Sequence, residues 1–118
     1  MARQTQPDLV QGTLDMLVLR VLKDEARHGF AIARMIKAWS SEHLKVEEGS
    51  LYPALHRMER RGWIAAEWGL SENNRRAKFY RITPAGKKRL KVEIDRWHRM
   101  VSAISGVLEF TQRQVVSS

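Results

Sequence analysis

Six apolar residues near the C-terminus recur at alternating intervals of four and three residues. They are Leu90, Ile94, Trp97, Val101, Ile104 and Leu108. This is the spacing of the a and d positions of heptads, and it predicts one helix with a single apolar seam. Thr83 and Pro84 suit the N-cap and the first helical position, so we expect the helix to span residues 84–110. Such a helix is roughly 40 Å long, which exceeds the width of a small domain, so part of the seam needs an external partner.

Apolar stripes predict three shorter helices upstream. The first covers about residues 9–23, with Asp8 as its N-cap, and the second begins at Gly29. The third covers about residues 50–61 and carries a buried stripe. Its landmarks are Ser50 as N-cap, Pro53 at the third helical position, Leu51, Leu55 and Met58 in the stripe, and Gly62 as the residue that ends it.

Two extended segments separate the third helix from the last one. Residues 63–68 and 78–83 predict two strands, and the polar residues 69–77 between them predict a hairpin loop. Three helices, a hairpin and a long helix make a mainly α fold with a small β-hairpin, in the α+β class. That order is typical of a winged helix-turn-helix over residues 9–83 with a dimerisation helix over residues 84–111. We expect flexible ends at residues 1–8 and 112–118.

The positive charge of the chain lies in one stretch. The net charge is +8, and residues 56–100 hold thirteen basic and five acidic side chains, whereas the two signs balance elsewhere. Charge concentrated in this way points to a polyanionic partner. The chain has no cysteine, which excludes disulfides and thiol chemistry. No apolar run is long enough to cross a bilayer and no signal core is present, so we expect a soluble cytoplasmic protein.

The third helix has the chemistry of a DNA recognition helix. On a helical wheel, polar side chains lie opposite its buried stripe and on the flanks: Tyr52, Pro53, His56, Arg57, Arg60 and Arg61. Arg57 and Arg60 suit guanine edges, and His56 can donate or accept a hydrogen bond. Ser50 and Tyr52 suit phosphate contacts. A solvated basic face without a partner is the competing interpretation.

The hairpin loop strengthens the DNA hypothesis. Arg75 and Arg76 follow two asparagines at the expected tip, and Lys78 comes just after them. A basic wing tip can enter the minor groove or contact phosphates. Two basic clusters on one helix and its hairpin are less easily explained as solubilising surface.

Trp97 lies in the middle of the heptad seam, where leucine is the usual residue. It can pack in a dimer interface, or a two-fold pair of tryptophans can stack on a flat aromatic ligand. No two of the four histidines are four residues apart, so we expect no metal site. The chain has no phosphate-binding loop, nucleophile elbow or paired-carboxylate motif, so we expect neither an enzyme nor a cofactor.

Three stretches of sequence resemble the PadR family of transcriptional regulators, in its short form with a single C-terminal helix. They are His28-Gly29-Phe30, the run from Gly49 to Gly62 that begins Gly-Ser-Leu-Tyr-Pro, and the run from Arg75 to Gly86. The resemblance extends over about residues 9–110. The second and third stretches are long and correctly spaced, whereas the first has Phe30 where the family usually has tyrosine.

The resemblance implies a homodimeric repressor that binds palindromic operators in double-stranded DNA. The family's recognition helix corresponds to Ser50, Tyr52, Pro53, His56 and Arg57, and its wing arginines correspond to Arg75 and Arg76. Its last helix, which dimerises, corresponds to the seam from Leu90 to Leu108. Some relatives bind flat aromatic effectors at the dimer interface, which here points to Trp97.

Two alternatives remain open at this point. An architectural protein that binds DNA without sequence preference would have the same basic surface. A winged-helix module that binds an acidic protein would have it too.

Overall fold

The computed structural model describes residues 11–111, which form four helices and one small antiparallel sheet. The chain is thus of the α+β class, as predicted. The helices are α1 (Gln11–Val21), α2 (Gly29–Trp39), α3 (Glu48–Arg60) and α4 (Pro84–Leu108), and the strands are β1 (Arg27–His28), β2 (Ile64–Leu70) and β3 (Arg76–Ile82). The predicted N-cap Asp8, the expected helix start at residue 9 and the flexible ends 1–8 and 112–118 lie outside the described residues.

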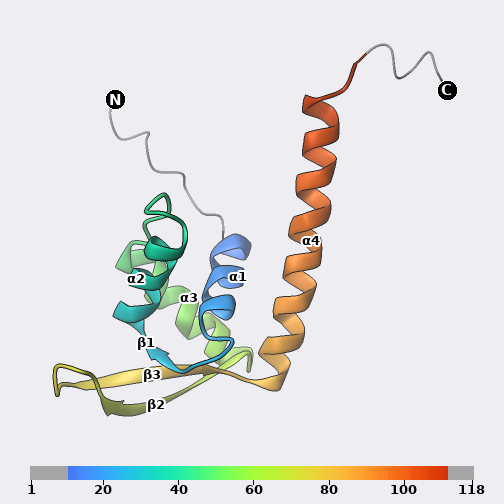
Figure 1. Cartoon of the computed structure of the whole chain (residues 1–118). Coiled ribbons are helices and arrows are strands. Elements are labelled where there is room, and N and C mark those ends of the chain that lie inside the picture. The colour runs from blue at the N-terminus through green and yellow to red at the C-terminus, as the bar shows by residue number, and fades with distance from the viewer. Residues whose placement is uncertain (1–10, 112–118) are drawn as a thin grey trace.

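The core lies between α1, α2 and α3 and extends to the sheet and to the first turns of α4. Each of these elements contributes apolar side chains that are almost fully buried, among them Val18, Leu19, Ile32, Leu51, Leu55, Met58, Ile64, Tyr80 and Leu90. In Figure 1 the first three helices stand together above the sheet, and α4 rises beside α1. The sequence pattern and the packing agree, because the apolar stripes of α1 and α3 point into this cluster.

The sheet has one more strand than the sequence predicted. Its order is β1-β3-β2, with Arg27 and His28 paired to Tyr80 and Phe79 of β3. The segment before α2, for which the sequence predicted no strand, therefore contains a short strand. The hairpin of β2 and β3 is also longer than expected, since pairing continues out to Leu70 opposite Arg76. The hairpin extends beyond the helices as a wing (Figure 1).

The structure corrects the start of α3 and confirms its end. The helix begins at Glu48 after Glu47, whose side chain makes no capping hydrogen bond, so Ser50 is not the N-cap and Pro53 lies inside the helix. Proline there leaves the Gly49 carbonyl without its usual amide donor, and Gly49 is exposed to water. At the other end Gly62 has φ 78°. The amides of Gly62 and Trp63 donate to the carbonyls of Glu59 and Met58, which is a Schellman motif.

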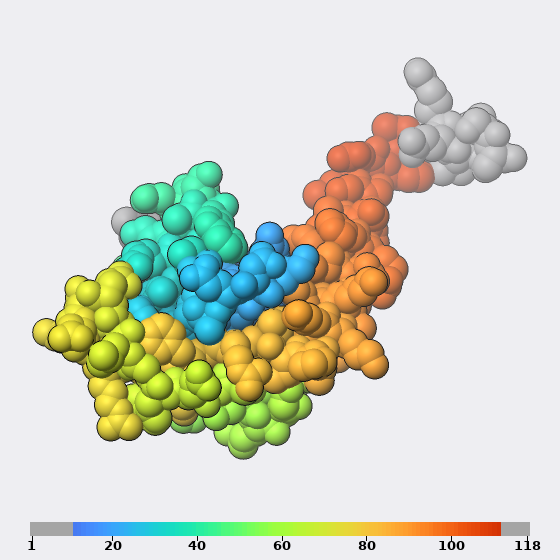
Figure 2. Space-filling model, turned by 60° about the horizontal axis from the view of Figure 1, so that its bottom comes forward, coloured from blue at the N-terminus to red at the C-terminus, as the bar shows by residue number. Residues whose placement is uncertain are grey.

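The last helix begins where the sequence predicted and ends two residues earlier. The Thr83 hydroxyl accepts a hydrogen bond from the Gly86 amide at 3.0 Å and donates one to the Gly62 carbonyl at 2.6 Å. This cap ties the start of α4 to the end of α3. The far half of α4 extends away from the body of the molecule (Figures 1 and 2). No helix in residues 11–111 combines the length and the hydropathy that crossing a membrane requires.

Gly86 is the tightest point of this junction. A Cβ on Gly86 would collide with the backbone carbonyl of Trp63 and come within 2.8 Å of the Ile82 side chain. We expect Gly86→Ala to lower the free energy of unfolding by about 1–3 kcal/mol, because backbone must move to make room. Urea denaturation measures the change. Gly106→Ala in the same helix is the control. Within residues 11–111 nothing lies within 4 Å of a Cβ at this position, so helix propensity predicts about 1 kcal/mol of added stability. Equal effects of the two changes would contradict the steric explanation.

Candidate nucleic-acid interface

One face of α3 is buried and the other is polar and exposed. Leu51, Ala54, Leu55 and Met58 are buried in the core. Of the side chains that the sequence placed opposite the stripe and on its flanks, Tyr52, Pro53, His56, Arg60 and Arg61 are exposed. These five are therefore accessible to a partner of the size of a DNA duplex.

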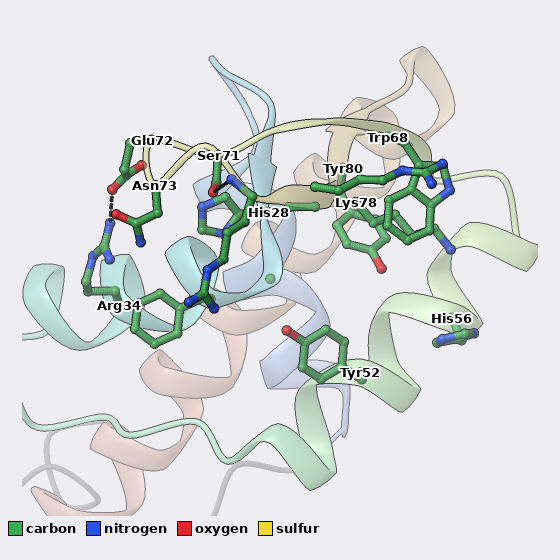
Figure 3. Close-up of a pocket in the computed structure, with 15 residues that line it drawn as sticks. His28, Arg34, Tyr52, His56, Trp68, Ser71, Glu72, Asn73, Lys78 and Tyr80 are labelled. Carbon is green, nitrogen blue, oxygen red and sulfur yellow. Dashed lines mark hydrogen bonds and ion pairs between the residues drawn. The ribbon is translucent and has the colours of Figure 1, made fainter.

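A cleft of about 550 Å³ lies between this face and the wing. Its walls come from the start of α2, the middle of α3 and the hairpin, as Figure 3 shows. Five of the predicted DNA-binding residues line it: Tyr52, His56, Arg75, Arg76 and Lys78. Cations of the wing and polar side chains of α3 thus face a common space, and a phosphate backbone lying along it can contact both.

The cleft also contains residues that the sequence did not point to as DNA-binding. Among them are His28 and Arg34 from the region of α2, and Trp68 and Tyr80 from the hairpin. His28 caps α2 through Nδ1, which accepts from the Ala31 amide at 3.2 Å. The missed strand β1 carries His28 into this position, so only the long-range pairing with β3 could have revealed it.

Tyr52 is fixed in the cleft by close contact with α2. A Cβ on Gly29 would lie 2.6 Å from the Tyr52 hydroxyl oxygen and 2.8–2.9 Å from its ring, so the ring occupies the space that a side chain would need. Partial burial, and then the nearby Glu48 carboxylate, raise the pKa of Tyr52 above its ordinary value of 10.0. The phenol therefore keeps its proton at neutral pH and remains a hydrogen-bond donor, which suits a phosphate contact.

The structure corrects the position of Arg57. Its guanidinium donates to the Asp15 carboxylate of α1 at 2.6 Å, and the two side chains are only 19% and 7% exposed. Asp15 is the one charged residue that is buried in residues 11–111. The wheel placed Arg57 on the exposed face because it could not register a partner 42 positions away. The guanidinium is held between α1 and α3, so we do not retain Arg57 as a base-reading residue.

Burial raises the pKa of Asp15 above its ordinary value of 3.8, and Arg57 offsets only part of the rise. The folded protein thus binds this proton more tightly than the unfolded chain does. This tighter proton binding stabilises the folded state. Its whole contribution to the free energy of unfolding is present below pH 3.8, and the contribution is lost as the pH rises through the folded-state pKa of Asp15. We expect the free energy of unfolding, relative to Asp15→Asn, to fall over that range and then to level off. Urea denaturation at a series of pH values measures it, and a difference that rises with pH would contradict this sign.

The other predicted residues lie outside the cleft or already have a partner. Ser50 lines a separate hollow of about 220 Å³ between α1 and α3, together with Arg57. Arg61 lies over the ring of Trp63, with its guanidinium carbon 5.2 Å from the ring centroid. Lys78 does line the cleft, but its ammonium is 3.5 Å from the Glu59 carboxylate. The structure therefore brings together part of the predicted set and leaves Ser50, Pro53, Arg57, Arg60 and Arg61 elsewhere.

The tip of the wing is ordered by its own backbone and by α2. The Ser71 amide donates to the Arg75 carbonyl at 2.8 Å, and the Asn74 amide donates to the Ser71 carbonyl at 2.8 Å. Arg34 of α2 forms an ion pair with Glu72 of the tip at 3.7 Å, visible as a dashed line in Figure 3. In Figure 2 the yellow wing tip lies close to the cyan α2. The wing therefore closes one end of the cleft.

The apolar seam of α4 divides into a buried and an exposed part. Leu90 is 4% exposed and belongs to the core of its own chain, and Ile94 packs partly against that core. This corrects the expectation that Leu90 contributes to a dimer interface, because it has almost no free surface. Trp97, Val101, Ile104 and Leu108 are 40–77% exposed.

Trp97 lines a groove of about 360 Å³ between α1 and α4. The other side chains around the groove are those of Thr13, Met16, Glu93, Arg96 and Met100, and Gly12 contributes backbone. The indole and the two methionines form a largely apolar surface, and Arg96 with its ion-pair partner Glu93, 3.7 Å away, forms one charged side.

Comparison with known proteins agrees with this arrangement. The model of the PadR-like family of transcriptional regulators matches residues 18–92. A transcriptional regulator from Clostridium thermocellum is 30% identical, with TM-score 0.75, and the match covers 84% of this chain and 96% of that one. A PadR family regulator from Eggerthella lenta is 30% identical, with TM-score 0.72 and 86% of each chain covered. One from Clostridium difficile is 26% identical, with TM-score 0.70, covering 80% of this chain and 97% of that one.

The family match covers well over half of the chain, from the first helix of the fold to the third turn of α4. The two structures at 30% identity have the same fold over more than four fifths of this chain. The chain therefore belongs to the PadR-like family of transcriptional regulators, and it is a DNA-binding regulator rather than an enzyme.

Proposed function

We propose that this regulator is a homodimeric repressor that recognises a palindromic operator, with α3 in the major groove and the wing on the adjacent backbone. The observation that carries the proposal is the shared cleft. Exposed Tyr52 and His56 of α3 face Arg75 and Arg76 of the wing across it. A recognition helix flanked by a basic hairpin suits base edges and phosphates at the same time.

The proposed division of labour follows the exposure and partners of each side chain. His56 and Arg60 are exposed on α3 and suit base edges. Tyr52 and Pro53 lie one turn before His56, Ser50 lies nearer the start of α3, and Arg61 follows its last turn. These four suit contacts with the sugar-phosphate backbone. Arg75, Arg76 and Lys78 suit the phosphates beside the wing, and Lys78 must first exchange Glu59 for its new partner.

The dimer proposal rests on the far half of α4. Seven apolar side chains are exposed on or just after it within the described residues: Trp97, Met100, Val101, Ile104, Val107, Leu108 and Phe110. A monomeric soluble protein rarely leaves so much contiguous apolar surface open to water. A two-fold partner that uses the seam from Ile94 to Leu108 would cover it.

The effector proposal rests on the Trp97 groove. A flat aromatic ligand can stack on the exposed indole and contact Met16 and Met100. An acidic substituent on it would compete with Glu93 for Arg96, which is 3.7 Å from that carboxylate. Because the groove lies between α1 and the proposed dimerisation helix, a ligand there touches both the dimer and the DNA-binding unit. We propose that such a ligand releases the operator.

Hydroxyl-radical footprinting tests the proposed binding mode. The full-length protein is added to the intergenic DNA upstream of its own gene, at about 0.15 M salt. We expect two protected half-sites about one helical turn, roughly 34 Å, apart on a pseudo-palindromic sequence. A single protected patch, or uniform weak protection along the fragment, would contradict a dimer on a palindrome.

A further inference from the structure

Trp68 is an exposed tryptophan that the core does not use. Trp68 lies on the outer part of β2, and 59% of its surface is exposed. The same face of the strand starts buried at Ile64 and becomes steadily more exposed through Ala66 and Trp68. A tryptophan so open to water contributes little to folding, so its contact with a neighbour needs another explanation.

That neighbour is Arg76. The guanidinium carbon of Arg76 lies 4.6 Å from the centroid of the Trp68 ring, the shortest cation–ring distance among residues 11–111. The register explains the contact. Trp68 is paired with Lys78, and Arg76 is paired with Leu70, so Trp68 and Arg76 are diagonal neighbours on adjacent strands, within reach of long side chains.

Arg75 and Arg76 differ from the other cations near the cleft, because neither has a carboxylate within ion-pair distance in residues 11–111, and of the two only Arg76 lies over an aromatic ring. Lys78 is paired with Glu59, and Arg34 with Glu72. Within the described part of the chain, no carboxylate lies within ion-pair distance of Arg76, and the indole is its contact. Stacking fixes the plane of the guanidinium but leaves the N–H donors at its edge available.

We propose that Trp68 is a positioning residue for DNA binding, whose ring holds the Arg76 guanidinium with its N–H edge ready for a backbone phosphate of duplex DNA. The proposal rests on the proposed function in that the wing contacts DNA. An unrestrained arginine would lose much side-chain freedom on gripping a phosphate, whereas a pre-oriented one loses less. Trp68 lies on the wing side of the cleft opposite α3, where a DNA strand would pass (Figure 3).

A double-mutant cycle tests this assignment. Binding of the full-length Trp68→Ala, Arg76→Ala and double variants to a duplex is measured by fluorescence anisotropy over a series of salt concentrations. We expect Trp68→Ala to weaken binding about two- to five-fold with an unchanged salt slope, and Arg76→Ala to reduce the slope by about one. The double variant should bind as Arg76→Ala does. Additive losses would mean that Trp68 contacts DNA by itself and would overturn the proposal.

Two control variants separate the ring from general structure. Trp68→Phe keeps a ring for stacking and should restore most of the affinity. Leu70→Ala removes an exposed apolar side chain next to Arg76 on the same face and should bind as the wild type does. The ¹⁵N relaxation of the Arg76 Nε–H group should show faster motion in Trp68→Ala than in Leu70→Ala. Equal motion in the two variants would overturn the proposal.

The cycle is run on a random duplex as well as on the intergenic fragment. Equal wild-type affinity for both would contradict the proposed sequence-specific function and would leave the Trp68 assignment standing if the cycle shows full coupling. Preference for the intergenic fragment together with additive losses in the cycle would support the sequence-specific function and would overturn the Trp68 assignment.

Discussion

Arg57→Ala is expected to destabilise the fold rather than to alter base recognition. The change strands the Asp15 carboxylate, which is 7% exposed and has Arg57 as its ion-pair partner. Removing one member of a buried ion pair typically costs about 3–5 kcal/mol, because the remaining charge stays desolvated. Urea denaturation at pH 7 measures the loss.

A compensating double variant distinguishes a stranded charge from a lost contact. Asp15→Leu combined with Arg57→Met replaces the pair by apolar side chains of similar size, and such replacements are often neutral or stabilising. We expect the double variant to recover most of the stability that Arg57→Ala loses. An Arg57→Ala protein of wild-type stability that had lost only its preference for the operator would return Arg57 to the base-reading set.

Ile104→Asp is expected to dissociate the proposed dimer. Ile104 is 50% exposed in the single chain, and a two-fold interface on the seam would bury two new carboxylates facing apolar side chains. We expect the dimer dissociation constant to rise at least about a thousandfold, which corresponds to roughly 4 kcal/mol. Sedimentation velocity measures it.

Ser102→Asp is the matched control, since it adds the same charge to an exposed position of α4 that is off the seam. It should sediment as the wild type does. A dimer that persists in Ile104→Asp, or that is lost equally in both variants, would mean that the seam is not the interface.

The order of the elements could be predicted from the sequence because each long element carries its own periodic signal. The heptad spacing located α4, and the Thr83-Pro84 cap located its start. β1 could not be predicted in this way, because a two-residue strand has no period and is defined by its pairing with β3, about fifty residues away. The start of α3 was missed because Ser50 suits an N-cap, whereas the helix begins at Glu48 after Glu47, whose side chain makes no capping hydrogen bond.

The candidate site was predicted in type and only partly in place. A wheel separates apolar from polar faces, so it located the exposed Tyr52 and His56. A wheel takes no account of residues on other elements. It therefore placed Arg57 on the exposed face, although the ion-pair partner of Arg57, Asp15, lies on α1. Trp68 was missed for a related reason. Strand alternation shows which face of the strand a residue is on. It does not show that the outer part of β2 extends beyond the core, so that Trp68 is exposed although Ile64 on the same face is buried.

The face formed by α3 and the wing is proposed to recognise a particular DNA sequence. Fluorescence anisotropy at about 0.15 M salt compares binding to the upstream intergenic fragment with binding to a shuffled fragment of equal length. We predict nanomolar binding to the first and a dissociation constant at least about a thousandfold higher for the second. Equal affinity for the two, with a steep dependence on salt, would contradict sequence recognition at that fragment and would favour an architectural role.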